Sequence, residues 1–184
     1  METKKKQHFL VLVPHRDARI QLQKQSELLI KNGLSNVYPF PHAAVLASLS
    51  KPLNDDELKK TAKTIRETIG KEKIIIEEMT SIILPMNNKK MELFGYKINL
   101  INVLEDNSKK INKKYSSIII GSFLIDRDLE QQTRLTAHEQ SGECESRISF
   151  RAAAIANMYW KPVKINGETC YKWKIGKLFW LPHP

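Results

Sequence analysis

The chain has 184 residues, of which 41% are hydrophobic and 27% charged. This length favours a single domain spanning residues 1–184, and the composition argues against a disordered chain. Thirty Lys and Arg against twenty Asp and Glu give a net charge of +10, which favours polyanionic partners. No apolar run approaches the roughly 18 residues of a membrane span, and no signal-peptide core is present, so we expect a cytoplasmic protein without a membrane partner.

The first elements predict a strand followed by a helix. Residues 9–13 are continuously apolar and end at Pro14, which is typical of a buried strand. Asp17 is a good N-cap, and the spacing of the apolar residues predicts a helix from there to Asn32-Gly33. Two prolines keep residues 37–41 extended.

A second helix is predicted after Asn54. Asn54 caps it, Glu57 three residues later returns a hydrogen bond to the cap, and the helix ends at Gly70. Its apolar stripe consists of Leu58, Ala62, Ile65 and Ile69.

Further strands are predicted in the middle of the chain. Residues 74–76 and 82–84 favour one long or bent strand, and residues 118–120 favour another. Residues 91–103 alternate, with Phe94, Tyr96, Ile98 and Leu100 as the face expected to be buried. The polar segment 133–147 predicts a long loop or a poorly packed helix.

The last third predicts an antiparallel hairpin over about residues 157–181. Asn166-Gly167 is the dipeptide best suited to a type I′ turn. The returning strand places Tyr171, Trp173 and Ile175 on one face and lysines on the other.

A seven-residue pattern occurs twice, at residues 41–47 and 150–156. Both copies contain an Ala-Ala pair, an aliphatic residue and a closing Ala, but the second position is His42 in one and Arg151 in the other. If the likeness is more than chance, the copies belong to two related lobes, and a pseudo-twofold arrangement would aim His42 and Arg151 into one central cleft.

The strand-helix start, the Pro-His opening of the first heptad, the second heptad and the aromatic hairpin together resemble the two-histidine (2H) phosphoesterase superfamily, which includes RNA-type cyclic phosphodiesterases. The resemblance implies an α+β fold of two pseudo-symmetric lobes with antiparallel sheets and outer helices. It also implies a His-x-Thr/Ser motif in each lobe, whose histidines act as general acid and base on a phosphate ester. This chain departs at three of the four positions, with Ala44, Arg151 and Ala153 beside the one match, His42.

These departures change the expected chemistry. Arg151 stays protonated and so cannot act as a base, although its guanidinium can clamp a phosphate. His15 stands near a helix N-terminus that favours anions, with Arg16 and Arg19 beside it. Trp160 is a candidate for stacking on a base, although the aromatic residues of a hairpin more often pack in the core.

The sequence therefore leaves three functions open. The first is binding of a phosphorylated ligand, an RNA end or a nucleotide, with impaired or no catalysis, using His42, Arg151, His15 and Trp160. The second is a divergent 2′,3′-cyclic phosphodiesterase in which His15 or His138 assists a catalytic His42. The third is a structural or protein-interaction module. No cofactor or metal site is expected, since Cys144 and Cys170 lack metal-type spacing.

Overall fold

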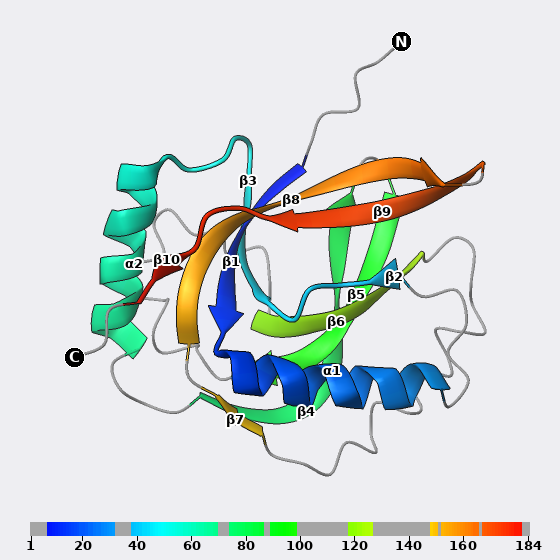
Figure 1. Cartoon of the computed structure of the whole chain (residues 1–184), viewed down its shortest axis with the longest axis horizontal. Coiled ribbons are helices and arrows are strands. Elements are labelled where there is room, and N and C mark those ends of the chain that lie inside the picture. The colour runs from blue at the N-terminus through cyan, green and yellow to red at the C-terminus, as the bar shows by residue number, and fades with distance from the viewer. Residues whose placement is uncertain are drawn as a thin grey trace.

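The computed structural model describes residues 7–31, 38–69, 74–86, 89–98, 118–126, 148–150, 152–165 and 167–181 (Figure 1). Two helices and ten strands lie in these ranges. In chain order they are β1 (Gln7–Pro14), α1 (Arg16–Lys31), β2 (Tyr38–Pro39), β3 (Ala44–Leu49), α2 (Asp55–Ile69), β4 (Ile74–Met86), β5 (Lys89–Ile98), β6 (Ile118–Asp126), β7 (Ile148–Phe150), β8 (Ala152–Ile165), β9 (Glu168–Ile175) and β10 (Phe179–Trp180). The predicted loop 133–147 lies outside the described residues.

The strands form one antiparallel sheet. Its order is β10-β8-β1-β3-β6-β5-β4-β7, with β2 added to β6 and β9 added to β8. The antiparallel α+β class is confirmed. The prediction was of two lobes with antiparallel sheets; the described strands instead belong to one sheet, because β1 pairs along both of its edges and joins β3 to β8.

Residues 44–47 of the first heptad lie on β3 and residues 152–156 of the second lie on β8, the two strands that flank β1. Leu12 of β1 pairs with Ala44 of β3 on one edge and with Ile155 of β8 on the other. Aligning the heptads by sequence would instead match Ala44 with Ala153, so the two strands are offset by two residues. An offset of two keeps the same face of the sheet, so the heptad strands present equivalent faces.

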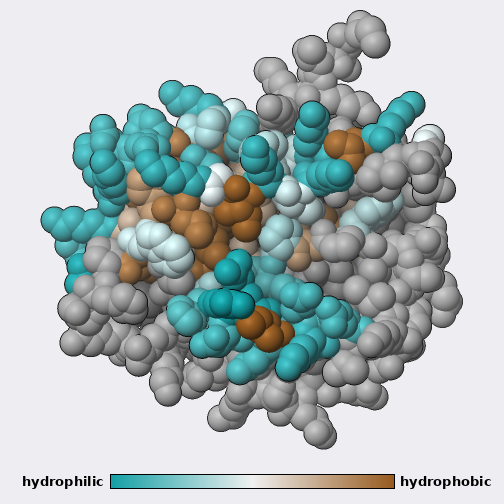
Figure 2. Space-filling view, viewed as in Figure 1, coloured by the Kyte–Doolittle hydropathy of each residue, from teal (hydrophilic) through white to brown (hydrophobic). Residues whose placement is uncertain are grey.

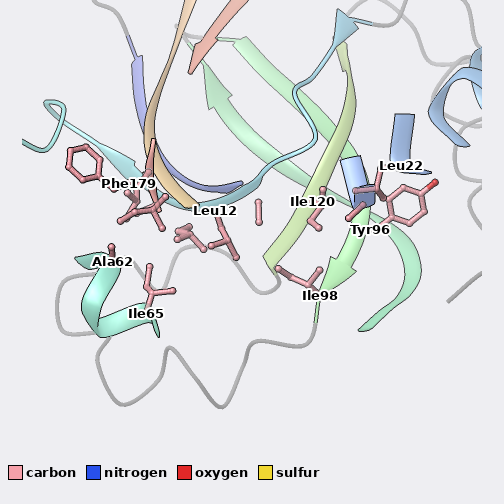
Figure 3. Packing of buried hydrophobic residues seen from close by; sticks show 14 of the residues in the cluster. Leu12, Leu22, Ala62, Ile65, Tyr96, Ile98, Ile120 and Phe179 are labelled. Carbon is pink, nitrogen blue, oxygen red and sulfur yellow. The ribbon is translucent and has the colours of Figure 1, made fainter. Parts of the chain in front are cut away.

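Alternation along the strands produces two apolar cores, one on each face of the sheet. Leu10 and Leu12 point to the core that both helices cover, whereas Phe9 and Val11 point to the second core, which contains no helix residue. Figure 3 shows the first core, in which Ala62 and Ile65 of α2, Leu12 and Phe179 lie together, and Leu22 of α1 lies beside Tyr96 and Ile120. The two described helices therefore cover the same face of the sheet.

Local capping explains where α2 begins. The Asn54 side chain accepts hydrogen bonds from the N–H groups of Asp56 (3.0 Å) and Glu57 (2.9 Å), and Glu57 accepts one from the Asn54 N–H (2.8 Å). The predicted capping box is confirmed. In α1, by contrast, the helix begins at Arg16, so Asp17 lies in the first turn and is not the cap.

Strand β5 is buried on both faces, which differs from the prediction of one buried face. Phe94, Tyr96 and Ile98 are buried as expected, and so are Met91 and Leu93 on the other face. The reason is that the second core covers that face, with β4 paired along one edge of β5 and β6 along the other. The position of Leu100 lies outside the described residues.

The C-terminal hairpin is confirmed. Strands β8 and β9 pair from Met158↔Ile175 to Ile165↔Glu168, and Gly167 in the turn has a φ of 86°, which favours glycine. Trp173 and Ile175 pack against the second core, while Lys172 and Lys174 are exposed. Neither described helix is long and apolar enough to span a membrane.

Candidate functional site

His42 stands on a loop that bulges out of the sheet. Pro39 pairs with Phe123 of β6 and Ala44 pairs with Ile120, so four residues of this segment oppose two residues of β6. The extra residues of this segment have to leave the plane of the sheet. Pro39 and Pro41 lack the N–H groups that would continue the ladder, and the two prolines thereby favour a bulge at this position.

A tight turn fixes the bulge. The N–H of Ala43 donates to the carbonyl of Pro41 at 2.6 Å, which makes His42 the central residue of a γ-turn. The N–H of Gly121 in β6 donates to the carbonyl of Ala43 at 3.1 Å. His42 is therefore presented by backbone hydrogen bonds on both of its sides.

The absence of a side chain at Gly121 makes room for the loop. A Cβ added there would lie 2.6 Å from Cε1 of Phe40 and 2.8 Å from Cδ1 of Leu93. The Phe40 ring packs edge-on against Trp173, with centroids 4.5 Å apart. Phe40, two residues before His42, thus anchors the loop in the second core.

His42 is half-buried, and its Nδ1 atom is buried without a hydrogen-bond partner. Burial lowers the pKa of its imidazole below the usual 6.5, and the positive charge of Arg19 lowers it further. The backbone of Gly121 and the carboxylate of Glu27 act in the opposite direction without reversing the shift. The ring is therefore neutral at pH 7 and can accept a proton.

A hollow of about 230 Å³ lies beside His42. Its walls come from one face of α1, from the bulged loop and from the end of β9. The lining residues are Arg16, Arg19, Ile20, Gln23, Pro41, His42 and Ile175. In Figure 2, hydrophilic side chains cover the exposed surface of α1 around an apolar spot.

The hollow combines positive charge with an apolar wall. Arg16 and Arg19 stand one turn apart on α1, and the described residues that line the hollow include no carboxylate. Glu27, one helical turn after Gln23, accepts a hydrogen bond from the Gln23 side chain at 2.9 Å. Two guanidinium groups and a neutral imidazole suit an anionic ligand, because guanidinium binds phosphate and carboxylate oxygens with paired N–H donors.

The structure brings together only some of the residues that the sequence nominated. His42 lines the hollow, but His15 does not; it is exposed, with Nδ1 3.4 Å from an oxygen of Asp17. Arg151 and His138 lie outside the described residues. Next to position 151, Ala152 pairs with Pro14, two residues before α1 begins at Arg16.

The expectation that Trp160 is exposed and binds the ligand is wrong. Its side chain is completely buried and stacks on Trp173 with centroids 5.7 Å apart. Alternation places it on the inner face of the hairpin, and the second core covers that face. Trp180 of β10, by contrast, is 65% exposed.

Sequence reasoning noted Arg16 and Arg19 but assigned them to a site around His15. Residues 16, 19, 20 and 23 follow the i, i+3, i+4, i+7 pattern of one helix face, and this signal could have grouped them. Nothing comparable in the sequence connects that face with Ile175, 152 residues after Gln23. Within the described ranges, no three His, Cys, Asp or Glu residues gather as a metal site would require.

The comparisons with known proteins place the chain in no family. No protein-family model matches it, and no curated protein matches its sequence significantly.

Proposed function

We propose that the chain binds a phosphorylated ligand, an RNA end or a nucleotide, in the hollow between α1 and the His42 loop. The observation that carries the proposal is the charge of this hollow: its described lining holds two arginines of one helix face and a neutral imidazole, and no carboxylate. The net charge of +10 adds a long-range attraction for such ligands. The resemblance to the 2H phosphoesterases motivates the choice of ligands to test.

Each part of the lining has a role in this proposal. Arg16 and Arg19 hold phosphate oxygens through charge-assisted hydrogen bonds. The neutral His42 donates or accepts a hydrogen bond at the phosphate or at a ribose hydroxyl. Pro41 and Ile175 provide apolar surface for the sugar or the base.

Binding without efficient turnover is the favoured form of the proposal. Hydrolysis of a phosphate ester near pH 7 needs one group that accepts a proton and another that donates one. Among the described residues that line the hollow, His42 is the one side chain that titrates near pH 7, since arginine keeps its proton. Arg151 remains a predicted phosphate ligand.

A second candidate is an active, divergent 2′,3′-cyclic phosphodiesterase. The position of His42 favours it, because its imidazole lines the hollow and a neutral imidazole can act as a general base at pH 7. An assay of 2′,3′-cyclic UMP opening in wild type and His42→Ala decides between the two forms. Turnover that disappears with His42→Ala would establish the enzyme, and no turnover in wild type would leave binding alone.

Titration of 3′-UMP and 2′,3′-cyclic UMP tests binding itself. We expect Arg19→Gln to weaken binding roughly 10- to 100-fold, since a hydrogen bond to a charged group contributes about 1.5–3 kcal/mol. Arg19→Lys keeps the charge but loses the paired donors, so it restores binding only in part. Arg151→Ala, by the sequence prediction, weakens binding as well.

Lys60→Gln is the matched control, because Lys60 is exposed on α2 and away from the hollow. It removes the same unit of charge and should leave the affinity for 3′-UMP unchanged. Equal affinity of wild type and Arg19→Gln would refute the proposal. Absence of binding in wild type would also refute it, in favour of a structural or protein-interaction module.

A further inference from the structure

Three lysines form a row on the outward face of the β8–β9 hairpin. Lys161 of β8 lies directly opposite Lys172 of β9, and Lys174 stands two residues along the same strand, opposite Tyr159. All three lysines are exposed. We call Lys161, Lys172 and Lys174 the lysine ladder.

The ladder works against the stability of the fold. Like charges directly opposite one another on an antiparallel pair are destabilising. Other lysines are compensated: Lys177, for example, lies 2.7 Å from a carboxylate oxygen of Asp55. Of the carboxylates whose side chains are described, none lies within 4.0 Å of a ladder ammonium group. Among the described side chains, therefore, nothing offsets this repulsion, and an external anion would relieve it.

The sequence of the hairpin has the same bias. From residue 159 to residue 174 the chain contains four lysines and one carboxylate, that of Glu168. On β9, Lys172 and Lys174 recur at about 7 Å, the spacing of alternate residues on a strand. In Figure 2, hydrophilic side chains lie over this hairpin. A row of regularly spaced cations suits a polymeric anion better than a single small one.

Aromatic rings lie beside the ladder on the same face. Tyr159 is half-buried, and its ring is 6.1 Å from that of His8, with the planes tilted by 54°. Rings next to a cationic track are the arrangement that binds single-stranded nucleic acid, since bases stack on the rings while phosphates contact the cations. This feature favours a nucleic acid over an anionic lipid surface.

The size of the hollow adds a second argument. Its volume of about 230 Å³ is below the roughly 300–1,000 Å³ usual for sites that enclose a drug-sized ligand. It suits a terminal phosphate with its sugar, and the remainder of a longer ligand would lie outside. Ile175, which lines the hollow, follows Lys174 directly, and in the described part of the sheet β9 pairs only with β8. The free edge of β9 thus separates the hollow from the ladder.

We propose that the lysine ladder contacts the phosphodiester backbone of a single-stranded RNA whose end occupies the hollow. This inference rests on the proposed function for the end of the RNA. It adds that the ligand is a polynucleotide, and that the segment next to its end crosses the edge of β9 to the outward face of the hairpin.

The test compares a mononucleotide with an oligonucleotide. The probes are 3′-UMP and a twelve-nucleotide oligouridylate with a 3′-phosphate, titrated over a range of salt concentrations. The variant is Lys161→Gln combined with Lys172→Gln. The control is Lys51→Gln combined with Lys60→Gln, which removes the same charge from exposed positions outside the hairpin.

We expect the ladder variant to bind 3′-UMP like the wild type and the oligonucleotide less tightly. Loss of two phosphate contacts should reduce the steepness of the plot of log association constant against log salt concentration by about 1.4. If the two proteins bind equally at 1 M salt, this change of slope lowers the affinity of the variant about 25-fold at 0.1 M salt. The urea midpoint of the ladder variant should equal or exceed that of wild type, because a repulsion is removed. The control variant should show nearly the same salt dependence of oligonucleotide binding as wild type, apart from the general effect of removing two positive charges.

The outcomes separate the two proposals. Unchanged oligonucleotide affinity in the ladder variant would overturn the ladder while leaving binding of 3′-UMP intact. If wild type does not bind 3′-UMP but binds the oligonucleotide in a way that depends on the ladder, only the proposal that the hollow binds the RNA end would be overturned. Phosphatidylserine vesicles are the last probe: ladder-dependent binding to vesicles without binding to the oligonucleotide would overturn the assignment to RNA.

Discussion

Substitution of Gly121 by Ala tests the physical basis of the His42 loop. The new methyl group would lie 2.6 Å from Cε1 of Phe40, whereas carbon atoms pack at about 3.5–4.0 Å, so the ring has to move by roughly 1 Å. Trp173, in contact with the same ring, resists this movement. Overpacking of this kind costs about 1–3 kcal/mol, and for a chain of this length each kcal/mol lowers the Tm by roughly 2–4 °C.

Urea and thermal unfolding of wild type, Gly121→Ala, Phe40→Val and the double variant measure this effect. Valine has no δ or ε atoms, so Phe40→Val removes the clash with the ring and leaves the contact with Cδ1 of Leu93 at 2.8 Å, although it destabilises the protein by itself. We therefore expect the Gly121→Ala penalty to shrink in the Phe40→Val background by more than 0.5 kcal/mol. Gly176→Ala is the control, since its added Cβ would lie 3.2 Å from the Asn157 carbonyl oxygen and need only a slight adjustment.

Two results would contradict this reasoning. One is a Gly121→Ala variant as stable as wild type. The other is strict additivity of Gly121→Ala and Phe40→Val, which would mean that the ring and the methyl group do not interact.

Three further predictions concern stability. The Asn157 side-chain amide forms hydrogen bonds with the N–H (3.0 Å) and the carbonyl (2.8 Å) of Leu53. Asn157→Ala removes both bonds, so the free energy of unfolding measured in urea should fall by about 1–3 kcal/mol. An unchanged free energy would show that these two bonds do not stabilise the fold. Asn54→Ala removes the cap of α2 and should lower the free energy of unfolding by about 1 kcal/mol, whereas Asn54→Ser should keep most of the stability that the cap provides. Equal losses in the two variants would contradict a role of the side chain as cap. Because the pKa of His42 is lowered in the folded protein, the unfolded chain binds a proton at this residue first as the pH falls below 6.5. Below that pH the free energy of unfolding of wild type should therefore fall relative to that of His42→Gln, by at most about 1.4 kcal/mol per pH unit. Parallel profiles of unfolding free energy against pH for the two proteins would refute the pKa shift.

Local chemistry explains which elements could be predicted. The α2 capping box, the 74–86 strand and the hairpin turn at Gly167 depend on residues close together in the chain, and all three agree with the structure. The start of α1 was wrong, because Asp17 can serve as a cap or as a favourable charge in the first turn, and both suit the helix dipole. Trp160 was misplaced because the sequence does not reveal which strand covers the inner face of the hairpin.

The sequence by itself determined the antiparallel α+β class and the positive charge, and it indicated His42 as a candidate site residue, since periodicity and residue type are local properties. Only the tertiary structure decided what surrounds His42. Strand pairing sets a bulge against β6, and the curvature of the sheet brings Arg19 of α1 and Ile175 of β9 to the same hollow. These contacts join residues that are far apart in the chain, such as Ala44 with Ile120 and Arg19 with Ile175, and they depend on strand order and register, which no local pattern specifies.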